Sequence, residues 1–190
     1  MNRTAIIAVF ALFLVPVILA TLLHSQWFDW QPAGGRNHGE LIQPVIELSD
    51  FEIRDASDRP VRRADLFERW QLVYVVSGVC EDACLENLYW LRQVRRAQDR
   101  HQPDVGLMFL SDQAQPPDTI EAIAELADDY LVLAGPPASA LLEQFPDHEG
   151  QGGFYIVDPM ANIIMRYPAD ADHNGIRRDL RRLLTWTQRD

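Results

Sequence analysis

Apolar residues along the chain gather in short runs separated by longer stretches of helical periodicity. Runs rich in β-branched and aromatic residues predict buried strands, and these runs occupy residues 72–76, 105–110, 130–133, 154–157 and 163–166. The last two flank the segment Asp158-Pro-Met-Ala-Asn162, whose turn-forming residues predict a hairpin. A smaller hairpin is expected over residues 50–61, and one helical turn over residues 64–70.

Helical patterns separate these strands. Apolar positions repeat at helical spacing after Cys80, where Leu85, Leu88, Leu91 and Val94 share one side. A second helix is expected after Pro116, with Asp118 as its N-cap and Glu121 as capping partner. Residues 136–145 predict a short helix, and residues 176–184 a closing amphipathic one.

This order of elements predicts an α/β sandwich with a central mixed sheet. A cysteine pair at the end of the first central strand, opening its helix, places the chain among thioredoxin-like folds. One sheet should hold the following core residues, with Cys80 at its edge: Val73, Val75, Val105, Leu107, Phe109, Val132 and Ile156.

The first forty residues have a different character. Residues 4–23 carry no charge and can span roughly 30 Å as a helix, the thickness of a bilayer's hydrocarbon core. Trp27, Phe28 and Trp30 follow, where an interfacial aromatic belt belongs. The alternative is a cleaved signal peptide, but its apolar region is usually only about 7–15 residues long. We therefore expect a single transmembrane helix that contacts the lipid bilayer.

The predicted organisation is a cytoplasmic tip (residues 1–3), a transmembrane anchor (4–23), a flexible tether (24–40) and a thioredoxin-like domain (41–190). The tether contains a Pro- and Gly-rich polar segment, residues 31–40. Arg3 before the anchor and Asp29 after it weakly favour an N-terminus inside the cell. The C-terminal domain would then lie on the far side of the membrane.

Charge excludes some classes of function. The formal net charge is −11 and the isoelectric point about 4.8, which argues against nucleic acid as a partner. All 17 basic residues are arginine. The absence of lysine excludes lysine Schiff-base chemistry and a P-loop lysine.

The candidate chemistry lies in Cys80 and Cys84, the only two cysteines. Both fall near a helix N-terminus, whose partial positive charge and free N–H groups favour thiolate over thiol. Such a pair can bind a soft metal or cycle through a disulfide; alternatively, both are merely small apolar core residues. Helical i, i+4 spacing separates Cβ atoms by about 5–6 Å, whereas a relaxed disulfide needs roughly 3.5–4.5 Å. A disulfide therefore requires a loosened first turn, and the spacing favours a metal.

Soft thiolates select Cu(I), which is the first candidate metal. Zinc is the second, but it requires four ligands. A further ligand would have to be a histidine. His148 lies in the loop before the strand at residues 154–157. In a thioredoxin-like sheet that loop faces the cysteine-bearing helix start, so His148 is the candidate third ligand; the alternative is a solvated loop residue.

Four strings resemble the Sco family of copper chaperones for cytochrome c oxidase, over roughly residues 44–185. They are Asp50-Phe-Glu-Ile-Arg-Asp55, Asp65-Leu-Phe-Glu-Arg-Trp70, Cys80-x-x-x-Cys84 and Tyr155-Ile-Val-Asp-Pro159. The resemblance implies a thioredoxin-like domain outside the bacterial inner membrane, in the periplasm. It also implies one copper bound by two cysteines and a distant histidine, and a role in assembling the oxidase copper centre.

The chain departs from the family pattern at several positions. Glu81 and Leu85 stand where the family usually has proline after each cysteine. The family histidine stands eight residues before the aspartate of Asp-Pro, a position that Gly150 occupies here, while His148 stands ten before Asp158. A two-residue insertion would account for this offset.

The leading expectation is a membrane-anchored assembly factor, rather than an enzyme, for cytochrome c oxidase. It would deliver copper or keep the thiols of an oxidase copper site reduced, through Cys80 and Cys84. Its partner would be the respiratory oxidase subunit that carries the copper site. Two alternatives remain: a periplasmic thiol–disulfide oxidoreductase without a metal role, and a metal-free interaction domain.

Overall fold

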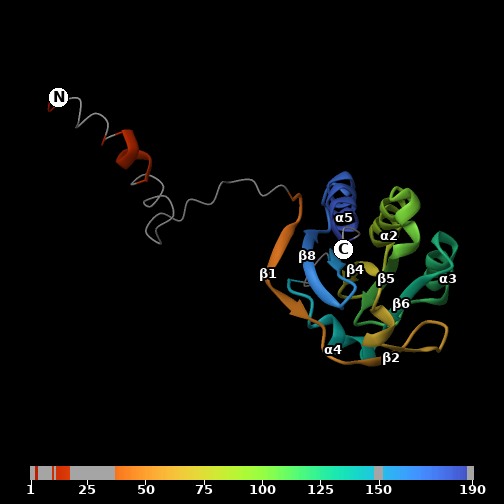
Figure 1. Cartoon of the computed structure of the whole chain (residues 1–190). Helices are drawn as coiled ribbons and strands as arrows, with labels where there is room; N and C mark the ends of the chain where they lie inside the picture. Colours follow the sequence, from red (N-terminus) through yellow and green to blue (C-terminus); the bar gives the residue numbers. More distant parts are fainter. Residues whose placement is uncertain (1–2, 4–9, 11, 18–36, 148–151, 188–190) are drawn as a thin grey trace. The chain divides into compact units, whose positions relative to one another are not determined.

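A six-stranded mixed sheet forms the centre of the unit that starts at Asn37 (Figure 1). The computed structural model describes residues 3, 10, 12–17, 37–147 and 152–187. Across the sheet the strand order is β1 (Glu40–Glu47), β8 (Asn162–Pro168), β7 (Gly153–Val157), β4 (Trp70–Val76), β5 (Val105–Ser111) and β6 (Tyr130–Ala134). Strands β4, β5 and β6 run parallel, and the β1–β8, β8–β7 and β7–β4 pairs are antiparallel.

Three helices cover one face of this sheet: α2 (Asp82–Arg96), α3 (Pro117–Leu126) and α5 (His173–Thr187) (Figure 1). Strand side chains alternate between the two faces. Leu72, Tyr74 and Val76 of β4 therefore pack under these helices, beside Leu88 of α2. Both cysteines belong to this same apolar cluster.

The opposite face is covered by smaller elements. They are the hairpin of β2 (Glu52–Arg54) and β3 (Pro60–Arg62), the 3₁₀ turn η1 (Arg63–Leu66), the turn η3 (Pro136–Ala138) and the short helix α4 (Ser139–Leu142). Val73 and Val75 of β4 point to this side and pack in a second apolar cluster. The central strand β4 is consequently buried along its whole length.

The predicted sandwich and its mixed sheet are confirmed. All seven predicted core residues are buried, with Val132 the most accessible at 6 %. The five predicted strands are present and extend one or two residues beyond the predicted ends. The hairpin predicted over residues 50–61 corresponds to β2 and β3, and the closing helix to α5.

Two helix predictions are corrected. Asp118 is not an N-cap: α3 begins at Pro117, its N-cap is Pro116, and no side chain caps it. Proline at the first helical position has its φ already set for the helix, which explains the earlier start. The short helix predicted over 136–145 is a 3₁₀ turn followed by the single turn of α4. A further 3₁₀ segment, η2 (Asp99–Asp104), follows α2.

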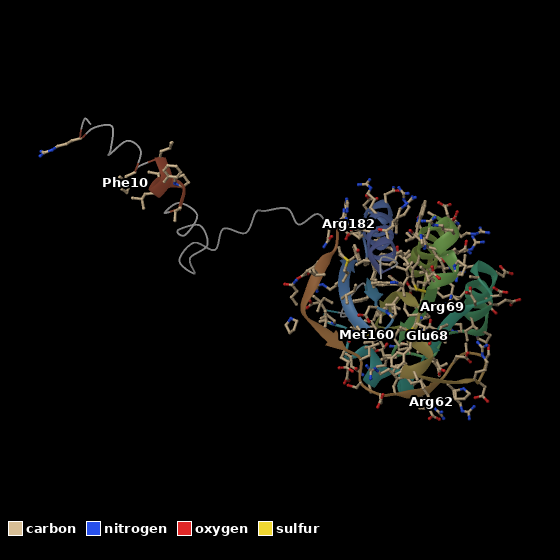
Figure 2. The ribbon with its side chains drawn as sticks, viewed as in Figure 1. Phe10, Arg62, Glu68, Arg69, Met160 and Arg182 are labelled. Carbon is tan, nitrogen blue, oxygen red and sulfur yellow. A yellow bond between two sulfur atoms is a disulfide. The ribbon has the colours of Figure 1, made fainter. Side chains whose placement is uncertain are left out.

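Strand β1 and the residues before it were not predicted as structured. His38 and Gly39, assigned above to the tether, both donate a backbone N–H to the buried Asp179 carboxylate of α5, at 2.6 and 3.0 Å. The Tyr167 hydroxyl donates to the same oxygen at 3.1 Å. Arg182, which is labelled in Figure 2, donates a hydrogen bond of 2.9 Å to the Asn37 side-chain oxygen. The start of the folded unit is therefore held against α5.

The N-terminal 36 residues form a separate unit. Within it, residues 12–17 are helical. Most of the predicted anchor (4–23) and most of the predicted tether (24–40) lie outside the described residues. Among the residues that are described, no helix has the length and apolar content needed to cross a membrane.

Candidate functional site

Cys80 and Cys84 form a disulfide at the end of β4, with their Cα atoms 5.2 Å apart. The expectation that one helical turn separates them is wrong. Helix α2 begins only at Asp82, and its N-cap Glu81 has extended backbone angles (φ −95°, ψ −176°). Because Cys80 precedes the helix, its sulfur can reach Cys84 without any loosening of the first turn. Both cysteines are buried, with 3 % and 6 % of their surface exposed.

The loop that carries Cys80 is fixed by the segment after β5. The Cys80 N–H donates to Gln115 Oε1 at 2.7 Å, and the Gln115 amide nitrogen donates to the Gly78 carbonyl at 3.2 Å. The Ser111 hydroxyl donates to the same carbonyl at 2.7 Å, while the Gly78 N–H donates to Asp112 at 2.8 Å. Gly78 has φ +113°, a conformation that glycine adopts without the penalty of a Cβ.

Local electrostatics at the disulfide combine opposing effects. No side chain caps the N-terminus of α2. Its first-turn N–H groups and the helix dipole therefore favour a thiolate at Cys80 after reduction. Glu81 and Asp82 are exposed carboxylates beside it, and like charge disfavours a thiolate. Solvent screens the two exposed carboxylates, which weakens their effect on a Cys80 thiolate. Cys80 itself is buried next to the helix end.

A pocket of about 410 Å³ opens beside the disulfide, and Cys84, not Cys80, contributes to its lining. Tyr74 of β4 also lines it, and its buried hydroxyl accepts a hydrogen bond from Asn87 at 3.1 Å. Burial raises the pKa of Tyr74, so the hydroxyl stays protonated at neutral pH. Three carboxylates complete the polar part of the lining: Glu81, Glu86 and Asp170.

His173 at the start of α5 stacks on Trp90 of α2, with ring centroids 5.1 Å apart and planes inclined by 16°. The His173 ring is also nearly perpendicular to the Phe154 ring (84°), with the two centroids 5.6 Å apart. Burial lowers the pKa of His173, an effect only partly offset by nearby Asp172 and Glu86. Its Nε2 atom is buried and has no hydrogen-bond partner within the described part of the chain. His173 was not among the site residues predicted from the sequence.

The predicted third ligand is His148. His148 and Gly150 both lie outside the described residues. Within residues 37–147 and 152–187, no three His, Cys, Asp or Glu side chains come close enough to hold a metal ion. His101 contacts Asp104, and His38 contacts Asp179, so these two histidines are engaged elsewhere. The structure therefore brings together the two predicted sulfur ligands, as a disulfide.

Comparison with known proteins agrees with this fold. A family model described as "Transmembrane-like, thioredoxin-like, C-terminal domain" matches residues 70–187, which include β4, both cysteines and α5. No curated protein sequence matches the chain.

Several solved structures share the fold. Apo Sco1 from Thermus thermophilus has a TM-score of 0.62 and 19 % identity, over 80 % of this chain and 99 % of that one. Yeast Sco1 with copper bound has a TM-score of 0.61 and 15 % identity, over 74 % and 93 %. A putative protein disulfide isomerase from Bacteroides thetaiotaomicron has a TM-score of 0.57 and 13 % identity, over 79 % and 93 %. The predicted Sco-like thioredoxin fold is thus confirmed.

Proposed function

The chain belongs to the family of transmembrane-like, thioredoxin-like C-terminal domains, and we propose that it is an assembly factor for a respiratory oxidase. The sequence resemblance to the Sco family and the fold shared with Sco1 structures support this proposal. It would act through reversible thiol–disulfide exchange at Cys80 and Cys84. In this role it keeps the cysteines of an oxidase copper site reduced, so that the site can accept its metal. The observation that carries the proposal is the disulfide between the two cysteines at the end of β4.

The surroundings of the disulfide fit exchange better than a purely structural crosslink. The bridge joins residues only four apart, so it ties no distant elements of the fold together. It sits at the start of a helix that lacks a side-chain cap, where a thiolate is stabilised. Cys84 lines a pocket that opens to solvent. A partner can therefore approach the bridge from the side of the pocket, and breaking the bridge unties no distant parts of the fold.

The exchange follows ordinary thiol chemistry. The reduced chain attacks a partner disulfide with one thiolate, and the partner's first sulfur leaves as a thiolate. The second cysteine then attacks the mixed disulfide, which frees the partner's other sulfur and closes the Cys80–Cys84 bond. Two electrons pass to the partner, whose disulfide becomes a dithiol. A separate reductant of the thiol class must then reduce the chain again.

Copper is the second candidate substrate, and the donor set of the reduced pair favours it. In the disulfide form the Cα atoms of the two cysteines lie 5.2 Å apart. Two thiolates at about this separation can both coordinate one soft ion such as Cu(I). The crystal structure of yeast Sco1 has copper bound to that protein. In this chain Cu(I) would be carried as cargo by the dithiol form only, because the sulfurs of a disulfide are not thiolates. His148 would serve as a third ligand from its loop.

Location and partners complete the proposal. The uncharged segment 4–23 would anchor the chain in the bacterial inner membrane, with the domain in the periplasm facing the oxidase subunit. Reporter fusions after Asp190 test this orientation. Active alkaline phosphatase agrees with a periplasmic domain, and an active cytoplasmic reporter contradicts it.

A Cu(I) competition experiment separates the two candidate substrates. Reduced full-length chain is titrated against a competing chelator and compared with Cys80→Ser, Cys84→Ser and His148→Ala. Delivery of copper requires that each cysteine variant bind at least about tenfold more weakly, equal to 1.4 kcal/mol. His24→Ala, in the predicted tether, is the control for the histidine. Wild-type Cu(I) affinity in both cysteine variants would exclude copper as a substrate and leave thiol exchange as the proposed activity.

A further inference from the structure

The pocket beside Cys84 differs from the rest of the site in its charge. Its lining contains the carboxylates of Glu81, Glu86 and Asp170 but no arginine. None of the three forms an ion pair with an arginine within the described residues, although Arg63, Arg95 and Arg166 are paired with carboxylates elsewhere. Glu81 is the N-cap of α2, Glu86 lies in the second turn of that helix, and Asp170 comes from the loop after β8. The carboxylates thus approach the pocket from two parts of the fold.

We propose that this pocket receives a positively charged side chain of the partner polypeptide, next to the Cys84 sulfur. The inference rests on the proposed thiol exchange and specifies its substrate: a cysteine with a lysine or arginine close to it. The volume of about 410 Å³ lies within the usual range for sites that take a small group. The aliphatic stem of such a side chain would lie along Val79 and Ala83, and its charged end near the carboxylates.

A metal ion is a poorer occupant of this pocket. Within the described part of the chain no group of three or more His, Cys, Asp or Glu side chains is close enough to coordinate one ion. Carboxylates that are spread around a pocket attract a cation without enclosing it. A guanidinium or ammonium group on a flexible stem satisfies that arrangement, because it keeps part of its hydration.

The same geometry selects the sulfur that reacts. Cys84 lines the pocket, whereas Cys80 does not, and the Cys80 backbone N–H donates to Gln115. A thiolate that enters through the pocket forms its new S–S bond with the Cys84 sulfur. The Cys80–Cys84 bond breaks, and Cys80 leaves as a thiolate at the start of α2, where the free N–H groups stabilise it. A second thiol of the same class then attacks the mixed disulfide and leaves Cys84 reduced.

Small thiols of different charge test the proposal directly. Reduction of the purified full-length chain is followed with 2-mercaptoethylamine (cationic), 2-mercaptoethanol (neutral) and 3-mercaptopropionate (anionic). Each rate is expressed per thiolate and divided by the rate of the same thiol with 2-hydroxyethyl disulfide. This removes differences in intrinsic nucleophilicity. At low ionic strength we expect the cationic thiol to exceed the anionic one by about tenfold, and 1 M salt to abolish most of the difference.

Matched variants distinguish the pocket from the overall charge of −11. Replacing Glu81, Glu86 and Asp170 together by Gln, Gln and Asn should bring the cation-to-anion ratio close to one. The control variant replaces three other exposed carboxylates, none of which lines this pocket: Asp99 by Asn, and Glu125 and Glu143 by Gln. It removes the same charge and should keep the ratio.

The outcomes separate this inference from the proposed function. Equal normalised rates for all three thiols, or an equal loss of selectivity in both triple variants, would overturn the pocket proposal while thiol exchange stands. A disulfide that none of the thiols reduces would overturn both. Cys80→Ser should trap a mixed disulfide through Cys84; trapping only in Cys84→Ser would contradict the assignment of the reacting sulfur.

Discussion

The backbone N–H of Cys80 donates to the side-chain oxygen of Gln115 at 2.7 Å, and this contact joins the disulfide loop to the segment after β5. Both residues are buried. The Gln115 amide nitrogen in turn donates to the Gln113 carbonyl at 2.8 Å and to the Ser111 hydroxyl at 3.1 Å. One side chain therefore holds Cys80 in the position from which its sulfur reaches Cys84.

Replacement of Gln115 by alanine should destabilise the domain by about 1–3 kcal/mol, because the buried N–H of Cys80 loses its acceptor. Urea unfolding of the oxidised protein measures the change. Gln113→Ala is the matched control, since that side chain is exposed and the hydrogen bonds of Gln113 involve its backbone. Equal stability of the two variants would show that the contact does not hold the loop.

His173 makes stability depend on pH. Its pKa is lowered in the folded protein, first by burial, so the folded state prefers the neutral ring. At pH values above the unfolded pKa of about 6.5 both states are neutral and no stability is lost. Below that value the unfolded state takes up the proton first, so stability falls as the pH falls from about 6.5 towards the lower folded pKa.

His173→Phe should reduce this loss of stability between pH 7 and pH 5, while an aromatic ring still stacks on Trp90. The free energy of unfolding, measured in urea across this range, gives the comparison. His101→Phe is the comparison variant. His101 lies in η2, which follows α2, and its ring contacts Asp104. An unchanged pH dependence in His173→Phe would contradict the assigned role of burial.

Much of the fold was predictable because it depends on local pattern. Strands such as Trp70–Val76 and Val105–Ser111 are buried on both faces, so their apolar runs are continuous and easily recognised. Strand β1 gave no such signal. It is an edge strand that contains Pro44 and exposes Leu41 and Val45, as edge strands can. Its place in the sheet depends on pairing with β8, which is far away in sequence.

The position of the cysteine pair after the central strand and at the start of a helix was predictable, but its chemical state was not. Its role as a site stays a prediction. The choice between metal and disulfide depended on whether α2 begins before or after Cys80, and sequence patterns leave helix ends uncertain by a few residues. The pocket was not predictable either. Asp170 approaches Glu81 and Glu86 only because the loop after β8 meets the start of α2 in the folded chain.

The buried Asp179 carboxylate should hold the beginning of the folded unit in place. Asp179→Ala removes the acceptor for the N–H groups of His38 and Gly39 and for the Tyr167 hydroxyl. We expect a loss of about 2–4 kcal/mol in unfolding free energy, since hydrogen bonds to a buried charge are among the stronger ones. Hydrogen exchange at His38 and Gly39 should become much faster.

Asp172→Ala is the control for this prediction, because the Asp172 side chain is exposed and accepts a hydrogen bond from the nearby backbone N–H of Asn174, not from His38 or Gly39. Unchanged exchange at His38 and Gly39 in Asp179→Ala would mean that β1 pairing alone holds this segment.

The reduction potential of the Cys80–Cys84 pair tests the central claim of thiol exchange most directly. The full-length chain is equilibrated in buffers of defined ratios of reduced to oxidised glutathione, and its free thiols are then alkylated and counted by mass. An exchanging pair should titrate reversibly as a two-electron couple with a midpoint between about −120 and −270 mV, the range of thiol–disulfide oxidoreductases. A midpoint below about −300 mV, typical of structural disulfides, would contradict the proposed function.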